Sequence, residues 1–207
     1  MNKRKKQNPI EQRIIQTFMD LSKQMPIEKI SVSELCRKCG IQRQTFYNHY
    51  SDVDNLIESI FDREGHRIFE TTRTYHGWQD GMYEILINLK KNKDFVNAVY
   101  QGVSREQLET RLYSQVRVLL MDIVNEMGGI NEITDEDKNY IVEYHKYAFA
   151  GTILDWIRYG MKEDPKEIVN NIEIVIHGSI PEAIERYAKL AKKSLNHKMD
   201  RKPKVSI

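Results

Sequence analysis

The side chains best suited to recognise another molecule lie between residues 42 and 49, where polar residues occur without any acid. Arginine can bond guanine, glutamine and asparagine can bond adenine, and tyrosine, threonine and histidine can bond phosphates. A solvated surface helix, the alternative interpretation, would usually carry an aspartate or a glutamate. We therefore predict that this segment reads the major groove of DNA through Gln42, Arg43, Gln44, Thr45, Tyr47, Asn48 and His49.

Cys36 and Cys39 form a C-x-x-C pair directly before this segment. A zinc site would need two further ligands, and the sequence offers no second cysteine pair and no histidines at ligand spacing. A redox pair could form across one helical turn. We favour two small buried residues packed between helices, because cysteine behaves as a small hydrophobe. Neither a metal nor a cofactor is predicted.

Helix signals on either side place these residues in a unit of short helices. Asn8-Pro9-Ile10-Glu11 supplies a cap, a proline at the first helical position and an acid. Ser31-Val32-Ser33-Glu34 predicts a capping box for a second helix, which Gly40 ends in a left-handed conformation. A third helix is expected from about residue 42 to 50, and Ser51-Asp52-Val53-Asp54 caps a fourth. This pattern predicts a three-helix helix-turn-helix unit.

The charge distribution agrees with this interpretation. The whole chain has a net charge of +2, but residues 1–50 hold ten Lys or Arg and four Asp or Glu, a balance of +6. A basic end on a mildly acidic body suits a protein that meets a polyanion through one end. Charge alone does not decide the question, because the excess of basic residues could also belong to an ordinary solvated surface.

The run from Ile30 to Tyr50 resembles the DNA-binding region of the TetR family of repressors. The most specific part is Thr45-Phe46-Tyr47-Asn48-His49-Tyr50, followed by a capped helix with Leu56; the resemblance covers roughly residues 8 to 62. It implies that Gln42, Arg43, Gln44 and Asn48 lie toward base edges, and that Thr45, Tyr47 and His49 lie near phosphates.

Three departures from that family pattern affect the expected contacts. Gln42 replaces a small capping residue, so the third helix should start without a good cap. Val53 stands where the family often has a lysine, so one phosphate contact is expected to be missing. Cys36 and Cys39 occupy positions that alanine or another small residue usually fills.

The rest of the chain is also predicted to be helical. Helices are expected from Trp78 to Lys91, from Asp94 to Tyr100, after Ser104, after Thr134 and after Asp164, with Pro181 interrupting the last stretch. We predict an all-α protein with a DNA-binding helix-turn-helix domain over residues 1–60. A helical ligand-binding and dimerisation bundle is expected over residues 61–192, and a basic, frayed tail over 193–207.

This second part resembles the C-terminal domain of a TetR branch that includes regulators of dihydroxyacetone kinase. The resemblance rests on the stretch from Leu89 to Phe95 and on the pattern Gly151, Trp156, Gly160, Met161 and Pro165. It does not specify a ligand.

Dimerisation is expected because a single recognition helix reads too few base pairs, whereas two helices roughly 34 Å apart double the contacts. Two stripes are candidate interfaces, and both could equally be core. They are Tyr144-Ala148-Gly151-Asp155 and Ile168-Ile172-Val175. The small Ala148 and Gly151 favour close helix approach and hence the interface.

An unidentified small-molecule effector is expected in the second domain. Candidate lining residues are polar or aromatic, although packing in the core or the interface is the commoner role for such side chains. They are Trp78, Tyr100, Tyr113, His145 and Trp156.

The function that these patterns favour is a sequence-specific, homodimeric DNA-binding regulator, a repressor that a ligand releases from operator DNA. The alternative is a helical interaction protein that keeps the fold without specific DNA binding. Motifs for an enzyme, such as a phosphate-binding loop or H-E-x-x-H, do not occur. No apolar run approaches the roughly 18 residues of a membrane span, so we expect a cytoplasmic protein without membrane contact.

Overall fold

The computed structural model describes residues 8–72, 77–127 and 130–200, and all regular elements in these ranges are helices. The first part contains α1 (Pro9–Ser22), a 3₁₀ turn (Ile27–Lys29), α2 (Val32–Cys39), α3 (Arg43–Tyr47) and α4 (Val53–Thr72). The second contains α5 (Trp78–Lys91), α6 (Lys93–Gly102), α7 (Arg105–Asn125), a 3₁₀ turn (Ile130–Glu132), α8 (Asp135–Arg158), α9 (Pro165–Ile176) and α10 (Ser179–Asp200). The predicted all-α fold class is confirmed.

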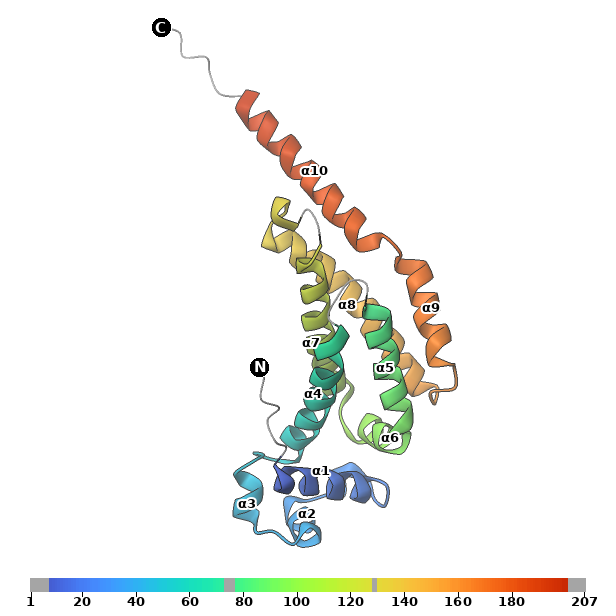
Figure 1. Ribbon diagram of the computed structural model, residues 1–207. Helices are drawn as coiled ribbons and strands as arrows, with labels where there is room; N and C mark the ends of the chain where they lie inside the picture. Colours follow the sequence, from blue (N-terminus) through green and yellow to red (C-terminus); the bar gives the residue numbers. More distant parts are fainter. Residues whose placement is uncertain (1–7, 73–76, 128–129, 201–207) are drawn as a thin grey trace.

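The helices form two groups joined by α4. Helices α1, α2 and α3 lie together at one end of the molecule, and α4 leads from them into a bundle with α5, α7 and α8 (Figure 1). Helix α9 packs against α5, and α10 extends beyond the bundle at the end opposite to α3 (Figure 1). The predicted boundary at residue 60 falls inside α4, so the division into domains stays a prediction.

The capping residues predicted for most helix starts are confirmed. The side chain of each capping residue accepts a hydrogen bond from a backbone N–H of the first turn, which satisfies one of the helix's unpaired donors. These residues are Asn8, Ser31, Ser104, Thr134 and Asp164.

The second helix departs in one detail from its predicted capping box. Ser31 accepts from the backbone N–H of Glu34, but the Glu34 carboxylate pairs with Arg37 at 2.7 Å instead of returning to the cap. Gly40 ends the helix with φ +66°, a left-handed conformation that glycine adopts without steric cost.

Two clusters of buried apolar side chains stabilise the fold. The first holds the helix-turn-helix unit together around Ile14, Phe18, Leu35, Phe46 and Leu56, all fully buried. It also includes Phe95, Val99 and Val103, from α6 and the residue after it, so the second part of the chain supplies part of the core beneath the DNA-binding unit. The second cluster lies between α5, α7, α8 and the start of α9.

The C-terminal region differs from the sequence-based expectation. The break between α9 and α10 lies at His177–Gly178, where Gly178 has φ +72°, and Pro181 sits in the first turn of α10 without interrupting it. Proline is tolerated there because first-turn N–H groups have no partner in the helix. Helix α10 continues to Asp200, whereas the sequence favoured a frayed tail from residue 193. Residues 201–207 of that tail lie outside the described ranges.

Within the described residues, no helix is long and apolar enough to cross a membrane.

Candidate DNA-reading surface and ligand cavity

Helix α3 is held in place by its apolar side and presents its polar side to solvent. Phe46 is fully buried, and its ring lies 5.7 Å from that of Tyr50, which is also buried. Gln42 stands at the N-cap without a side-chain hydrogen bond to the helix, as its replacement of a small capping residue predicted. The short helix is therefore positioned by packing rather than by its cap.

The predicted base-reading residues form one exposed surface. The exposed members are Gln42, Arg43, Gln44, Tyr47 and Asn48, while Thr45 and His49 are half-buried. Within the described part of the chain, Arg43 forms no hydrogen bond or ion pair, so its guanidinium is available to a ligand. The amide of Gln44 donates to Asn48 Oδ1 at 3.2 Å, which aligns two side chains suited to adenine on one helix face.

His49 has a partner inside the protein. Its Nδ1 lies 3.3 Å from Oε1 of Glu11 on α1, and the other oxygen of that carboxylate accepts from Arg63 on α4 at 2.8 Å. Glu11 therefore joins the end of the recognition segment to α4. The sequence did not indicate this link, because Glu11 and Arg63 are 52 residues apart.

The two departures near α3 have simple structural reasons. Val53 is half-buried against the first core cluster, so its position serves packing and provides no cation. Cys36 and Cys39 are buried free thiols in the same cluster, which confirms the packing interpretation. Burial raises the pKa of the Cys36 thiol, so the thiol stays protonated near neutral pH.

A cavity of about 620 Å³ lies between the helix-turn-helix unit and the helical bundle. Its walls come from α1, α4, α5, α6, α7 and α8. This volume falls within the roughly 300 to 1,000 Å³ of small-molecule sites. Because α1 and α4 line it directly, a molecule bound there would contact the DNA-binding unit itself.

The cavity has a mostly apolar wall and a polar seam where α4 meets α7. The seam contains Arg63, Arg111 and Gln115, and Gln115 Nε2 donates to Asp62 Oδ1 at 2.9 Å. Among the described residues that line the cavity, none is Asp or Glu. These residues were not predictable from the sequence, because charged side chains on helices usually face solvent.

The five predicted ligand residues do not come together. Tyr100 lines the large cavity, where its hydroxyl accepts from Arg105 at 3.1 Å. Trp78 lines a separate hollow of about 40 Å³, which has room for only a few water molecules. Tyr113, His145 and Trp156 line neither space.

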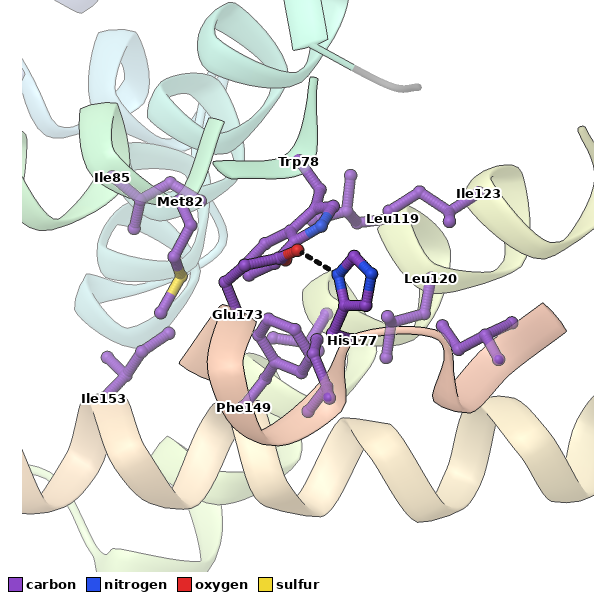
Figure 2. A pocket seen from close by; sticks show the side chains of 13 residues that line it. Trp78, Met82, Ile85, Leu119, Leu120, Ile123, Phe149, Ile153, Glu173 and His177 are labelled. Carbon is purple, nitrogen blue, oxygen red and sulfur yellow. Dashed lines mark hydrogen bonds and ion pairs between the residues drawn. The ribbon is translucent and has the colours of Figure 1, made fainter. Parts of the chain in front are cut away.

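The hollow beside Trp78 is closed by α9. Figure 2 shows Trp78 and Phe149 beside the contact between Glu173 and His177, in which Oε1 and Nδ1 lie 2.8 Å apart. The Trp78 and Phe149 rings meet edge to face at 5.5 Å. Good packing leaves little space here, so the larger cavity is the stronger candidate for a ligand.

The three predicted residues outside both cavities have packing roles. His145 is buried, with Nδ1 donating to the Ile141 carbonyl at 2.8 Å and Nε2 2.9 Å from the Ser179 hydroxyl. Trp156 donates from Nε1 to the Glu163 carbonyl at 3.3 Å, and Tyr113 packs edge-on against Tyr147. All three fit the packing alternative for polar aromatic side chains.

The turn after α8 contains most of the residues in the pattern that links the C-terminal domain to the dihydroxyacetone kinase regulators. Gly160 has φ +82°, Met161 and Pro165 are buried, and Trp156 bonds across the turn to Glu163. These residues build the corner between α8 and α9. Gly151 stands apart, because a Cβ added there would meet open space.

One face of α8 exposes large apolar side chains. Tyr140, Tyr144 and Tyr147 are 68%, 76% and 54% exposed, and the candidate stripe Tyr144-Ala148-Gly151-Asp155 faces outward over its whole length. The stripe on α9 divides: Ile168 belongs to the core, whereas Val175 is 81% exposed. The core alternative for this stripe therefore holds for Ile168 and not for Val175.

A helix-turn-helix unit with an acid-free exposed recognition surface, joined to a helical domain with a cavity, defines a DNA-binding transcriptional regulator. Residues 76–178 match the family described as the transcriptional regulator C-terminal region TetR_C_8. The chain is a TetR-like transcriptional regulator that resembles the DhaS branch.

Relatives of known sequence are regulators as well. The chain is 27% identical over 148 residues to the HTH-type dhaKLM operon transcriptional activator DhaS of Lactococcus lactis subsp. lactis (strain IL1403), spanning 70% of this chain and 78% of that protein. It is 26% identical over 136 residues to the uncharacterized HTH-type transcriptional regulator YvdT of Bacillus subtilis (strain 168), spanning 60% of this chain and 70% of that protein.

Solved structures share the fold. A structure of the dihydroxyacetone kinase operon activator DhaS matches with a TM-score of 0.65 at 22% identity, covering 84% of this chain and 97% of that one. A TetR transcriptional regulator from Rhodococcus sp. RHA1 matches with a TM-score of 0.55 at 11% identity, covering 91% and 99%. The proteins named here are transcriptional regulators and not enzymes.

Proposed function

We propose that this protein binds operator DNA as a homodimer and is a repressor that a small molecule releases from the DNA. The observation that carries the proposal is the exposed polar surface of α3, which lacks acids and holds Arg43, a residue with no ion pair among the described residues. Gln42, Arg43, Gln44 and Asn48 would face base edges, and Thr45, Tyr47 and His49 would lie near phosphates. A cytoplasmic location accords with this role.

The dimer interface that we propose centres on the outer face of α8. Large exposed apolar side chains that gather on one face mark protein–protein contacts. Tyr144, Ala148 and Gly151 provide an aromatic side chain beside small residues that permit close helix approach, and Val175 of α9 is a second exposed apolar candidate. The α10 helix and the recognition surface lie at opposite ends of the molecule (Figure 1), which leaves α3 free to contact DNA.

The effector site that we propose is the 620 Å³ cavity, with Tyr100 among its walls. An effector changes DNA affinity only if it binds the two states of the protein unequally. A molecule in this cavity would contact α1 and α4 on one side and α7 and α8 on the other. Its binding can therefore favour one placement of the recognition helices over another.

Activation is the second candidate for the regulatory effect. The similar DhaS of Lactococcus lactis is named a transcriptional activator, which favours it. A reporter gene behind the bound promoter separates the two, because deletion of a repressor raises expression and deletion of an activator lowers it.

The experiment that tests the DNA-reading surface compares two arginine variants by fluorescence anisotropy. We expect Arg43→Ala to weaken binding to the specific site by about 1–3 kcal/mol per half-site, with a smaller loss on random DNA. The matched control is Arg186→Ala, whose side chain pairs with Glu182 on α10, the helix that extends away from α3 (Figure 1). Equal losses on specific and random duplexes would refute a base-reading role for Arg43. If the unmodified protein bound neither duplex, the interaction-protein alternative would be favoured.

A further inference from the structure

The large cavity combines an apolar wall with a cationic seam. Phe61, Leu89, Phe95 and Ile153 are among the apolar side chains that line it. Among the described lining residues, the charged ones are two arginines, Arg63 and Arg111. A cavity of this composition suits a molecule with a hydrocarbon part and a negatively charged group.

Arg111 lacks a partner for part of its guanidinium. Its Nη1 is buried from solvent and has no hydrogen-bond partner among the described residues. Its Nη2 donates to the backbone carbonyl of Asp54 at 3.4 Å, a long contact with a neutral group. A buried, unsatisfied cationic donor is costly, and a rotation of the Arg111 side chain that turned Nη1 toward the cavity would let an anion bound there satisfy it.

Arg63 is a second cation in the cavity wall, and it is already paired with a carboxylate of the protein. It donates from Nη2 to Glu11 Oε2 at 2.8 Å, and its side chain is 28% exposed. Arginine presents five N–H donors, so Arg63 can bind a further acceptor or exchange Glu11 for it. Gln115, one turn beyond Arg111 on α7, adds an amide to the same seam.

We propose that the cavity binds an amphipathic organic anion, with its carboxylate or phosphate group at Arg111 and Arg63 and its hydrocarbon chain along the apolar wall. The proposal rests on the proposed function, in which this cavity is the effector site. Arginine favours both headgroups because its planar fork matches their oxygen atoms. A neutral or cationic amphiphile of the same length would bring no anionic partner to the guanidinium groups of Arg63 and Arg111.

The same geometry connects the headgroup to the recognition segment. An anion at Arg63 competes with Glu11, and Glu11 also pairs with His49 at the end of that segment. Loss of the pair between Glu11 and Arg63 removes one polar link between α1 and α4, the link to which His49 is joined through Glu11. The charge of the effector, and not only its volume, therefore changes the position of the DNA-reading surface.

The test measures binding of four probes to the purified full-length protein by titration calorimetry. Decanoate and decyl phosphate represent the two anionic headgroups, and decanol and decyltrimethylammonium are the neutral and cationic controls. We expect at least one anion to bind at least tenfold more tightly than both controls. The proposal would be overturned if decanol bound as tightly as both anions. It would also be overturned if no probe bound to a protein that still binds DNA.

Variants locate the anion within the cavity. Arg111→Gln should weaken decanoate binding at least tenfold, and Arg111→Lys should keep part of the affinity because it retains the charge. The matched control is Arg117→Gln on the same helix, whose side chain pairs with Glu143 and Asn139 and is not among the residues that line the large cavity. Leu89→Trp, which fills part of the cavity, should weaken every amphiphile. Unchanged decanoate affinity in Arg111→Gln would refute the assigned headgroup site.

A parallel DNA-binding measurement separates this proposal from the proposed function. If decanoate binds through Arg111 but leaves DNA affinity unchanged, the anion site stands and the effector role fails. If neutral and anionic amphiphiles bind equally and both alter DNA affinity, the effector role stands and the anion preference fails.

Discussion

Phe95 connects the two halves of the molecule, and its removal is the most informative change in the core. It lies on α6 but belongs to the first core cluster, where its ring meets Phe18 edge-on at 6.0 Å and stacks on Phe61 at 6.1 Å. The side chain is only 3% exposed and also lines the large cavity. Phe95→Ala should therefore destabilise the DNA-binding unit through a residue outside it.

The expected magnitude follows from burial and from the neighbouring cavity. Substitution of a buried phenylalanine by alanine costs about 3–5 kcal/mol, part of which is the price of a new closed void. Here the vacated space joins a cavity that already exists, which reduces the void contribution. We expect about 3 kcal/mol, which corresponds to a decrease in Tm of about 6–12 °C for a chain of this size.

The assay is thermal unfolding followed by circular dichroism at the helix band, without added ligand. Tyr83→Ala on α5 is the control, because that side chain is 38% exposed and its removal should change stability by about 0.5 kcal/mol or less. A decrease in Tm of less than about 3 °C for Phe95→Ala would show that α6 does not anchor the helix-turn-helix unit, and would refute the argument.

Three further predictions concern single side chains. Burial raises the pKa of the Cys36 thiol, so we expect its reaction with a thiol reagent at pH 8 to be at least about tenfold slower in native protein than in urea; equal rates would contradict its buried position. Tyr144→Arg should shift the protein from dimer to monomer in sedimentation velocity without loss of helix signal, because the side chain is exposed in one chain; an unchanged dimer would remove Tyr144 from the interface. Glu11→Gln should lower stability by about 1 kcal/mol or less, since the ion pair with Arg63 is partly exposed, and should reduce the effect of decanoate on DNA affinity; a full response would exclude Glu11 from the coupling.

The local elements were predictable because their signals are local. Caps at Asn8, Ser104 and Thr134 and the left-handed glycine at Gly40 each act within a few residues of their own position. The recognition surface was predictable for the same reason, since a short helix with one buried apolar side must expose its polar one. Pro181 was wrongly expected to interrupt the last helix: the chain breaks three residues earlier, at the left-handed Gly178, which places Pro181 in the first turn of α10.

The cavity was not predictable, because it depends on contacts between distant helices. Nothing near Arg63 or Arg111 in the sequence distinguishes them from solvated charges, and Phe95 shows no sign of its packing against the first domain. Tyr113 and Trp156 were plausible ligand residues by type, but both instead pack. Side-chain type indicates what a residue can bind, whereas long-range packing decides what it meets.

The position of the cavity suggests a direct route from ligand to DNA. Its walls include α1, the helix that supports α2 and α3, so a ligand need not act through a distant surface. Coupling between sites of this kind requires only that the ligand favour one arrangement of a few packed elements. In our proposal, that choice depends on the pairs that Glu11 forms with His49 and Arg63.

The most direct test of the central claim is a mobility shift of the purified protein on DNA flanking its own gene, with excess random duplex as competitor. We predict a discrete complex that survives the competitor, that requires Arg43 and that weakens with salt as phosphate contacts release counterions. Only diffuse, salt-sensitive binding that is the same on every duplex would contradict sequence-specific recognition by α3.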